Sequence, residues 1–446
     1  MTATPAEPPF ALRARLLSPL AGGGFLDEPD GVLQVDAAGR LTRVSGWVDD
    51  DATTSVVDLR PLVLMPGMVD LHAHLPQIPN AGLGSGLDLL TWLDRYIFPL
   101  ERAYDRSVAE RQAPAAFRAF AAAGTTTVVA YAALWPDSTD AAFAAAQAHG
   151  IRAVIGKVMM DRLSYDTEIK PTEILEMSLR QSDELATRWH GADRGRLRYA
   201  FTPRFAVSCS AEMLRESASL AASHGAYWQT HVSEDEDEIA EVARLFPEAE
   251  DYLDVYDRAE ALGSKTILAH AVHLSVREVG RLVEADARVA HCPASNLFLS
   301  SGMMPLAAYR DAGMAVGLGS DVAAGPELSM FTVMRAGAVT QRVLELTGVT
   351  DSTAALRPLD WLRMGTLDGA RVLGMGADIG SLEVGKEADL IAIDPRLTEP
   401  LPSEGSPEAS DEVAGRLVFR PHPDMVRAAW VRGRLLAGPP GVDGIG

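Results

Sequence analysis

The feature that most constrains the fold is an alternation of short apolar runs with longer helical segments through the middle of the chain. From Leu62 onward, each apolar run is followed by a longer helical stretch, and Ala-rich segments flanked by charges, such as residues 109–124 and 211–225, lie between the runs. Eight runs occur in order, at 64–75, 125–131, 152–160, 198–205, 227–234, 266–270, 288–293 and 315–321. Eight strands alternating with helices over roughly 300 residues predict a (β/α)8, TIM-like barrel.

Both ends of the chain have a different texture from the middle. The first 60 residues alternate short apolar runs with turn residues, and residues 379–393 and 425–436 are β-rich again. These ends predict a small β-sandwich domain built from both termini. The stretch 399–415 is rich in Pro, Ser, Glu and Asp and is expected to form an exposed loop.

We therefore predict an α/β protein with one large and one small domain. Residues 63–377 are expected to form the barrel, and residues 1–62 with 378–440 the small β domain. Residues 441–446 are expected to be a frayed tail.

Composition limits the kinds of partner that the chain can bind. Asp and Glu number 61 against 40 Lys and Arg, which gives a net charge of −21. Because this charge repels phosphate backbones and anionic lipids, we expect neither a nucleic-acid polymer nor a membrane as a partner. No stretch reaches the roughly 18 uncharged apolar residues of a membrane span, and the first residues do not resemble a signal peptide. Two cysteines, Cys209 and Cys292, are too few for a disulfide framework, so we expect a cytoplasmic protein with a small-molecule substrate.

Two histidines end the first predicted barrel strand. His72 and His74 are two residues apart, and on a strand such residues point to the same side. Two imidazoles side by side at the carboxyl end of a barrel strand are typical of a metal site. The alternative is a pair of incidental surface histidines.

Further candidate ligands close later strands. His231 closes the fifth predicted strand, His270 the sixth and Asp321 the eighth, where barrels carry their active sites. Imidazoles and a carboxylate that converge there suit one zinc ion with an open position for water. A second metal would need a lysine at the end of the fourth strand, but that strand ends in residues 202–205, without lysine. Lys157 lies in the middle of the third run and is expected to be structural.

One acidic residue is placed to move protons. Glu234 follows His231 by three residues, close enough to reach a water at the metal site. We expect Glu234, Asp321 and His270 to be catalytic. The acidic residues that follow, 235–238, are expected to form a solvated run.

The sequence resembles the amidohydrolase superfamily over essentially its whole length, and within that superfamily it resembles the guanine deaminase family. The stretches that carry the resemblance are HAHLPQ (72–77), LLTWLDRYIFPLERAY (89–104), GKVMMDR (156–162), TPRF (202–205), THVSE (230–234), YLDVYD (252–257), AHCPASNLFLSSG (290–302) and GLGSDVAAG (317–325).

The resemblance implies a metal ligand set and a set of substrate contacts. It places one zinc ion on His72, His74, His231 and Asp321, with His270 beside the metal and its water. It implies purine contacts from Gln77, Arg204 and Phe205, together with His231 and Glu234, and it makes Glu234 the proton shuttle.

The expected purine contacts also make chemical sense. A forked Arg204 donor could meet two acceptors of guanine, the carbonyl oxygen and nitrogen 7. Gln77 can donate and accept at once, and Phe205 offers an aromatic face to the base. The alternative for Arg204 is a structural salt bridge.

The resemblance implies zinc-dependent hydrolytic deamination of guanine to xanthine and ammonia, in purine catabolism, by a homodimer. Ser320 and Ala324 stand where many members of the family carry Thr and Gly, and the Gly-rich residues 78–89 could shape the pocket for a different ring. The alternative function is therefore deamination of another amino-substituted aza-aromatic ring, such as a pterin, 8-oxoguanine or a triazine. A third possibility, of another class, is a non-catalytic scaffold, which predicts missing ligands.

Overall fold

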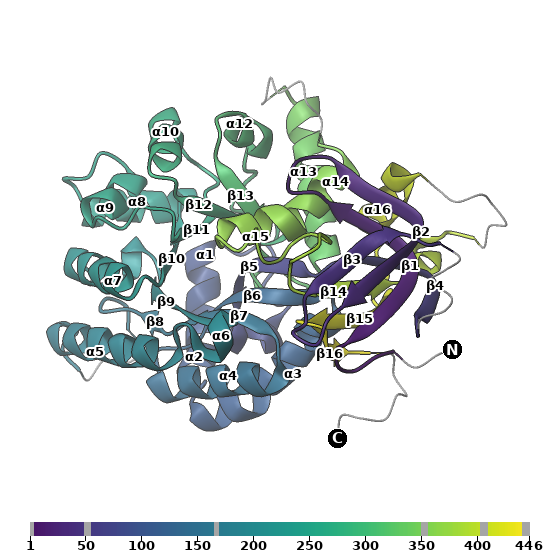
Figure 1. Cartoon of the computed structure of the whole chain (residues 1–446). Coiled ribbons are helices and arrows are strands. Elements are labelled where there is room, and N and C mark those ends of the chain that lie inside the picture. The colour runs from purple at the N-terminus through teal and green to yellow at the C-terminus, as the bar shows by residue number, and fades with distance from the viewer. Residues whose placement is uncertain (1–3, 49–54, 165–168, 349–355, 402–408, 439–446) are drawn as a thin grey trace.

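The computed structural model describes residues 4–48, 55–164, 169–348, 356–401 and 409–438. Two sheets organise this part of the chain (Figure 1). A parallel sheet in the middle of the sequence is surrounded by helices, and a second sheet at its flank is built from the two ends. No helix in the described ranges is both long and apolar enough to cross a membrane.

The parallel sheet follows the order of the chain, with each strand hydrogen-bonded to the next. Main-chain bonds from Asp321 N to His72 O (2.7 Å) and from His74 N to Val322 O (3.0 Å) bring the segment after its last strand onto its first strand and close the ring. The predicted barrel is confirmed, and two of the expected runs match β6 and β11 residue for residue. The barrel strands are β5 (Met68–His74), β6 (Thr125–Tyr131), β7 (Arg152–Gly156), β9 (Leu197–Pro203), β10 (Tyr227–Val232), β11 (Thr266–His270), β12 (Arg288–His291) and β13 (Ala315–Leu318), with the short β8 (Val158–Met159) beside β9.

Helices cover the outside of the barrel, and local residues set where they begin and end. At α7, for example, Ser210 accepts a hydrogen bond from Met213 N at the start, and Gly225 ends the helix with a φ of +59°. The helices are α1 (Leu89–Trp92), α2 (Phe98–Arg102), α3 (Arg106–Ala122), α4 (Pro136–His149), α5 (Pro171–Trp189), α6 (Ala192–Gly195), α7 (Ala211–His224), α8 (Glu236–Leu245), α9 (Tyr252–Arg258), α10 (Val276–Glu284), α11 (Pro293–Phe298), α12 (Leu306–Asp311), α13 (Met330–Leu346), α14 (Pro358–Arg363), α15 (Gly369–Val372) and α16 (Ser410–Phe419).

The barrel interior, away from the carboxyl ends of the strands, is a packed core. One side chain or more from each strand between β5 and β12 enters this core, so the interior is filled rather than open. Polar residues are therefore left to the carboxyl ends of the strands. The buried residues of this core that come from barrel strands are Val69, Leu71, Val129, Val154, Ala200, Tyr227, Ile267 and Ala290.

The second sheet joins the two ends of the chain, as predicted. Strand β4 lies between β1 and β14, so N-terminal and C-terminal strands are hydrogen-bonded neighbours (Figure 1). Its strands, in spatial order, are β16 (Arg434–Ala437), β15 (Val426–Val431), β14 (Leu390–Ile393), β4 (Val57–Pro66), β1 (Phe10–Pro19), β2 (Phe25–Val35) and β3 (Leu41–Gly46).

A buried ion pair ties this sheet to the barrel. Arg152 of β7 donates to Asp389 Oδ2 (2.9 Å) and Glu387 Oε2 (2.5 Å), which lie just before β14. The division into residues 1–62 with 378–440 and residues 63–377 stays a prediction, and the tail 441–446 lies outside the described residues.

The prediction of a loop over residues 399–415 is wrong at the end of that stretch. Helix α16 begins at Ser410, inside that stretch. The helix buries Val413, Ala414 and Leu417, so packing of an apolar face outweighs the polar composition of the segment.

Candidate active site

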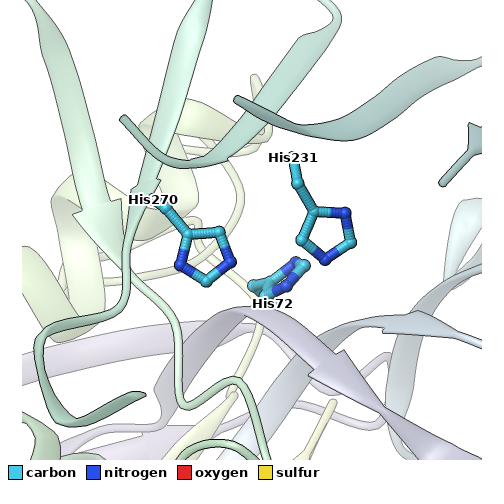
Figure 2. A group of neighbouring side chains, drawn as sticks. All are labelled: His72, His231 and His270. Carbon is cyan, nitrogen blue, oxygen red and sulfur yellow. The ribbon is translucent and has the colours of Figure 1, made fainter. Parts of the chain in front are cut away.

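The five predicted metal-site residues meet at the carboxyl end of the barrel. His72 and His74 lie at the end of β5, His231 near the end of β10 and His270 at the end of β11, and Asp321 follows β13. All five side chains are buried. Figure 2 shows the rings of three of these histidines turned toward one common space. They come from three different strands, so only the folded barrel brings them together.

The nitrogen and oxygen atoms of these five side chains lie very close to one another. Nε2 of His72 and Nε2 of His74 are 3.2 Å apart, and each lies 3.2 Å from Asp321 Oδ1. Ligand atoms of His72, His231 and His270 also lie within 4.8 Å of one another. Nitrogen lone pairs and carboxylate oxygens crowded in this way are stabilised by a cation at their centre.

The protonation of the histidines fits a metal site. Burial lowers the pKa of His72 to about 4 and the pKa of His231 well below its usual value, so both imidazoles are neutral at neutral pH. Neutral imidazole is the form that binds metal ions.

Hydrogen bonds also fix which ring nitrogen is available. His231 Nδ1 lies 2.5 Å from the carbonyl oxygen of Arg204, and His270 Nδ1 lies 2.9 Å from Asn296 Oδ1. Because both oxygens only accept, each Nδ1 carries the proton and each Nε2 is left unprotonated. Within the described residues, the buried Nε2 of His270 has no hydrogen-bond partner. These residues fit a divalent metal ion.

The carboxylate of Asp321 is held from several sides. Burial alone would raise its pKa, but the imidazoles of His72 and His74 keep the pKa well below its usual range. Ser295 Oγ donates to Asp321 Oδ2 at 2.6 Å. The backbone of Asp321 has a φ of +48°, and His270 has a φ of +73°, both of which are strained for residues with a side chain. Such strain is typical of functional sites.

A second carboxyl group, Asp70, supports the site from behind and was not predicted. It accepts from Ser320 N (2.8 Å), Ser320 Oγ (2.6 Å) and His72 N (3.2 Å), and burial raises its pKa to about 7. Serine and threonine both carry a hydroxyl group, so either residue at position 320 can donate to Asp70. Asp70 thus links the first and the last strand next to two predicted ligands.

Glu234 lies where the sequence predicts it, next to the metal-site residues. Its Oε2 is 3.4 Å from His270 Nε2, and Ser301 Oγ donates to its Oε1 at 3.2 Å. Burial, followed by the negative charge of Asp321, raises the pKa of Glu234 well above its usual value. A carboxyl group whose pKa is raised toward the working pH is suited to taking up and releasing protons.

The acidic residues after Glu234 are not all solvated, which corrects one expectation. Glu238 is fully buried, accepts a hydrogen bond from Glu234 N at 3.0 Å and accepts another from Tyr252 OH at 2.6 Å. With Asp235 it forms a capping box at the start of α8. Glu238 therefore holds the backbone of Glu234, whereas Glu236 is exposed as expected.

A cavity of about 360 Å³ opens beside these groups. The three predicted substrate contacts, Gln77, Arg204 and Phe205, all line it, together with Glu234. Sequence reasoning missed its apolar wall, whose residues are Leu89, Trp92, Leu93 and Leu299. The first three of these come from the stretch 89–104, so the resemblance of that stretch was the available signal.

Arg204 has a second role that the sequence left open as an alternative. It forms a buried ion pair with Glu101, and Gln77 Nε2 donates to Glu101 Oε1 at 2.7 Å. Arg204 is thus both a cavity residue and part of a salt bridge. Lys157, by contrast, donates to Ser178 Oγ at 2.8 Å, in keeping with the expected structural role.

The fold is that of a barrel hydrolase, and residues that could hold a metal ion lie at the carboxyl ends of its strands. The chain belongs to the amidohydrolase family, whose model matches residues 63–436. The chain is 36% identical over 336 residues to guanine deaminase of Mus musculus, covering 75% of this chain and 73% of that protein. It is 38% identical over 348 residues to guanine deaminase of Escherichia coli K12, covering 78% and 76%.

Solved structures agree with these relatives. The chain resembles the structure of E. coli guanine deaminase with a TM-score of 0.87 and 32% identity, covering 96% of this chain and 99% of that one. A guanine deaminase from C. acetobutylicum with guanine bound in its active site gives the same TM-score and coverage at 29% identity.

Proposed function

We propose that this protein is an enzyme that deaminates guanine hydrolytically to xanthine and ammonia. The observation that carries the proposal is one cavity whose wall combines residues that could hold a metal ion, a buried carboxyl group and a forked cationic donor. Relatives with this activity in their names cover more than seven tenths of the chain. A homodimer stays a prediction.

The polar residues of the cavity suit a guanine ring. Arg204 offers parallel N–H donors to the carbonyl oxygen at position 6 and to nitrogen 7. Phe205 supplies an aromatic face, and the apolar wall around Trp92 excludes water from the ring. Adenine carries an amino group where guanine has the carbonyl, so it would set a donor against the arginine.

For the metal, we propose one zinc ion held by His72, His74, His231 and Asp321, with His270 beside it. A zinc ion there would act as a Lewis acid that lowers the pKa of a water molecule toward about 7.

The chain's own residues would then move the protons. Asp321 would orient the attacking water, helped by His270, whose Nε2 is 3.9 Å from Asp321 Oδ2. Glu234 would take a proton from the water and deliver it to nitrogen 3 of the ring while carbon 2 becomes tetrahedral. Glu234 would then take the second proton from the hydroxyl group now on carbon 2 and pass it to the amino group. The carbonyl of xanthine forms as the bond from carbon 2 to nitrogen breaks and ammonia leaves.

The proposal is tested by measuring ammonia release from guanine, adenine, a pterin, 8-oxoguanine and an aminotriazine. We expect guanine to have the highest kcat/KM by at least about tenfold over each other ring, the scale on which polar recognition discriminates. A higher value for another ring would overturn the choice of substrate and leave an aminohydrolase. No ammonia from any ring, with metal present, would favour the scaffold.

A further inference from the structure

A buried carboxyl group lies behind the two polar residues that are proposed to bind the substrate. Glu101 belongs to α2 and is fully buried, and it is not among the residues that line the cavity. One oxygen accepts from Gln77 Nε2 at 2.7 Å, and the other accepts from Arg204 Nη1. A single side chain thus holds both recognition residues, which are 24 and 103 positions away in the sequence.

This contact fixes the orientation of the Gln77 amide. An ionised carboxylate only accepts, so the NH₂ end of the amide must face Glu101 and the Oε1 end must face away from it. Oε1 is buried and has no hydrogen-bond partner among the described residues, and Gln77 lines the cavity. Gln77 therefore offers the cavity an acceptor, next to the donors of Arg204.

Glu101 also sets the charge of the recognition surface. The Arg204 side chain is 3% exposed and the Glu101 side chain 0%, so neither charge can be balanced by water. Together they form a neutral pair, which suits a neutral ring better than an anion. The guanidinium group is further held over the ring of Phe98, with its carbon 5.4 Å from the ring centre.

We propose that Glu101 is the positioning residue that sets the specificity of this site. By holding Arg204 and Gln77, it fixes a pattern of donors beside one acceptor. The matching edge of a ligand is a carbonyl beside an N–H, the lactam edge of guanine, whereas adenine reverses both groups. The inference rests on the proposed function, because it names the residue that selects the same substrate.

The test compares Glu101→Gln with the wild-type enzyme. Glutamine has almost the same shape but leaves the charge of Arg204 unbalanced and lets the Gln77 amide turn over. We expect metal content to stay at the wild-type level and kcat/KM for guanine to fall by about 30- to 1,000-fold, with most of the loss in KM. Urate, a purine that is anionic at neutral pH, should bind at least about tenfold more tightly to the variant, because the cavity has gained net positive charge.

Two further variants keep the outcome clear. Asp389→Asn is the matched control, since Asp389 is also a buried carboxyl group paired with an arginine, Arg152, but lies between the barrel and the second sheet. It should change neither the KM for guanine nor the affinity for urate. Glu101→Asp keeps the charge but shortens the side chain, so it should raise the KM for guanine without tightening urate binding.

Each result separates the two proposals. A wild-type enzyme that releases no ammonia from guanine would contradict the proposed function, whereas urate binding measured by calorimetry would still test Glu101. Unchanged urate affinity in Glu101→Gln, or a KM for guanine within threefold of the wild-type value, would overturn the role of Glu101. So would a loss of activity that follows loss of metal.

Discussion

Replacing Glu234 with glutamine tests the proposed chemistry most directly. Glutamine keeps the length of the side chain and an oxygen that can accept from Ser301 Oγ, now 3.2 Å from Glu234 Oε1. It removes only the ability to carry a proton. Because the group is buried and lies 3.4 Å from His270 Nε2, no bulk water can take over its role at that point.

The structure also indicates the size of the effect. Among the described residues that line the cavity, the carboxyl groups are Glu234 and Asp321, and Asp321 is engaged by His72 and His74. General acid–base catalysis is worth about 10²–10⁴ in rate, which is about 3–5 kcal/mol at about 1.36 kcal/mol per factor of ten. Without a second free carboxyl group, we expect a loss of about 10³ in kcat.

Stability should not fall with this substitution. A carboxyl group whose pKa is raised in the folded protein costs stability as pH rises above its unfolded value of 4.5, since folding then requires proton uptake. The metal-free Glu234→Gln protein should therefore be at least as stable as the metal-free wild type at neutral pH, by thermal unfolding.

The assay is steady-state ammonia release with guanine, together with elemental analysis and guanine binding by calorimetry. Glu236→Gln, in the same acidic run but exposed, is the matched control and should behave as wild type. A Glu234→Gln enzyme with kcat within about tenfold of wild type would show that another group carries the proton. Loss of metal from this variant would show instead that Glu234 is a ligand.

Three other perturbations give independent predictions. Elemental analysis should find one zinc per chain, and a chelator should abolish activity and lower the unfolding temperature, because the ligands come from separate strands; two metals per chain would contradict this. Arg204→Ala should lower kcat/KM for guanine by about 30- to several-thousand-fold, a loss of about 2–5 kcal/mol, and should also destabilise the fold because the buried carboxylate of Glu101 loses its ion pair with Arg204; equal turnover of adenine and guanine by the wild type would refute this use of Arg204. Burial lowers the pKa of Lys157 from 10.5 to about 7, so the unfolded chain holds a proton that the folded chain lacks between these values and stability rises with pH across that window. The difference between the two pKa values corresponds to about 5 kcal/mol of folding free energy. After the loss of hydrogen bonds such as that to Ser178, Lys157→Met should stabilise the protein by about 3 kcal/mol near pH 7, and in chemical denaturation it should remove the rise of stability with pH across this window.

The barrel could be predicted because its strands carry a strong local signal. β6 and β11 are buried along their whole length, so their apolar runs begin and end where the strands do. The predicted ligands follow from the same signal, since each lies at or just beyond the carboxyl end of a strand. Helix α16 was missed because its segment is rich in polar residues, although Val413, Ala414 and Leu417 repeat at helical spacing.

The supporting residues of the site were harder to predict for two different reasons. The acidic run predicts that Glu238 is solvated, yet Asp235 and Glu238 have the spacing of a capping box, which is a local signal for burial at the start of a helix. Glu101 has no such signal. Its contacts with Gln77 and Arg204 join segments that only the closed barrel brings together. The charge and the periodicity of the sequence near Glu101 therefore do not predict these contacts.

Arg204 connects the proposed substrate site with the proposed metal site. Its side chain lines the cavity, whereas its carbonyl oxygen accepts from His231 Nδ1 (2.5 Å) and from Thr230 Oγ1 (3.1 Å). The backbone of Arg204 thus sets the tautomer of a proposed ligand, while its side chain is proposed to contact the ring. Because a substitution at this position leaves the carbonyl in place, Arg204→Ala should keep its metal although it loses guanine. A variant that lost both would show that the Glu101 pair, and not the carbonyl alone, holds β9 in register with His231.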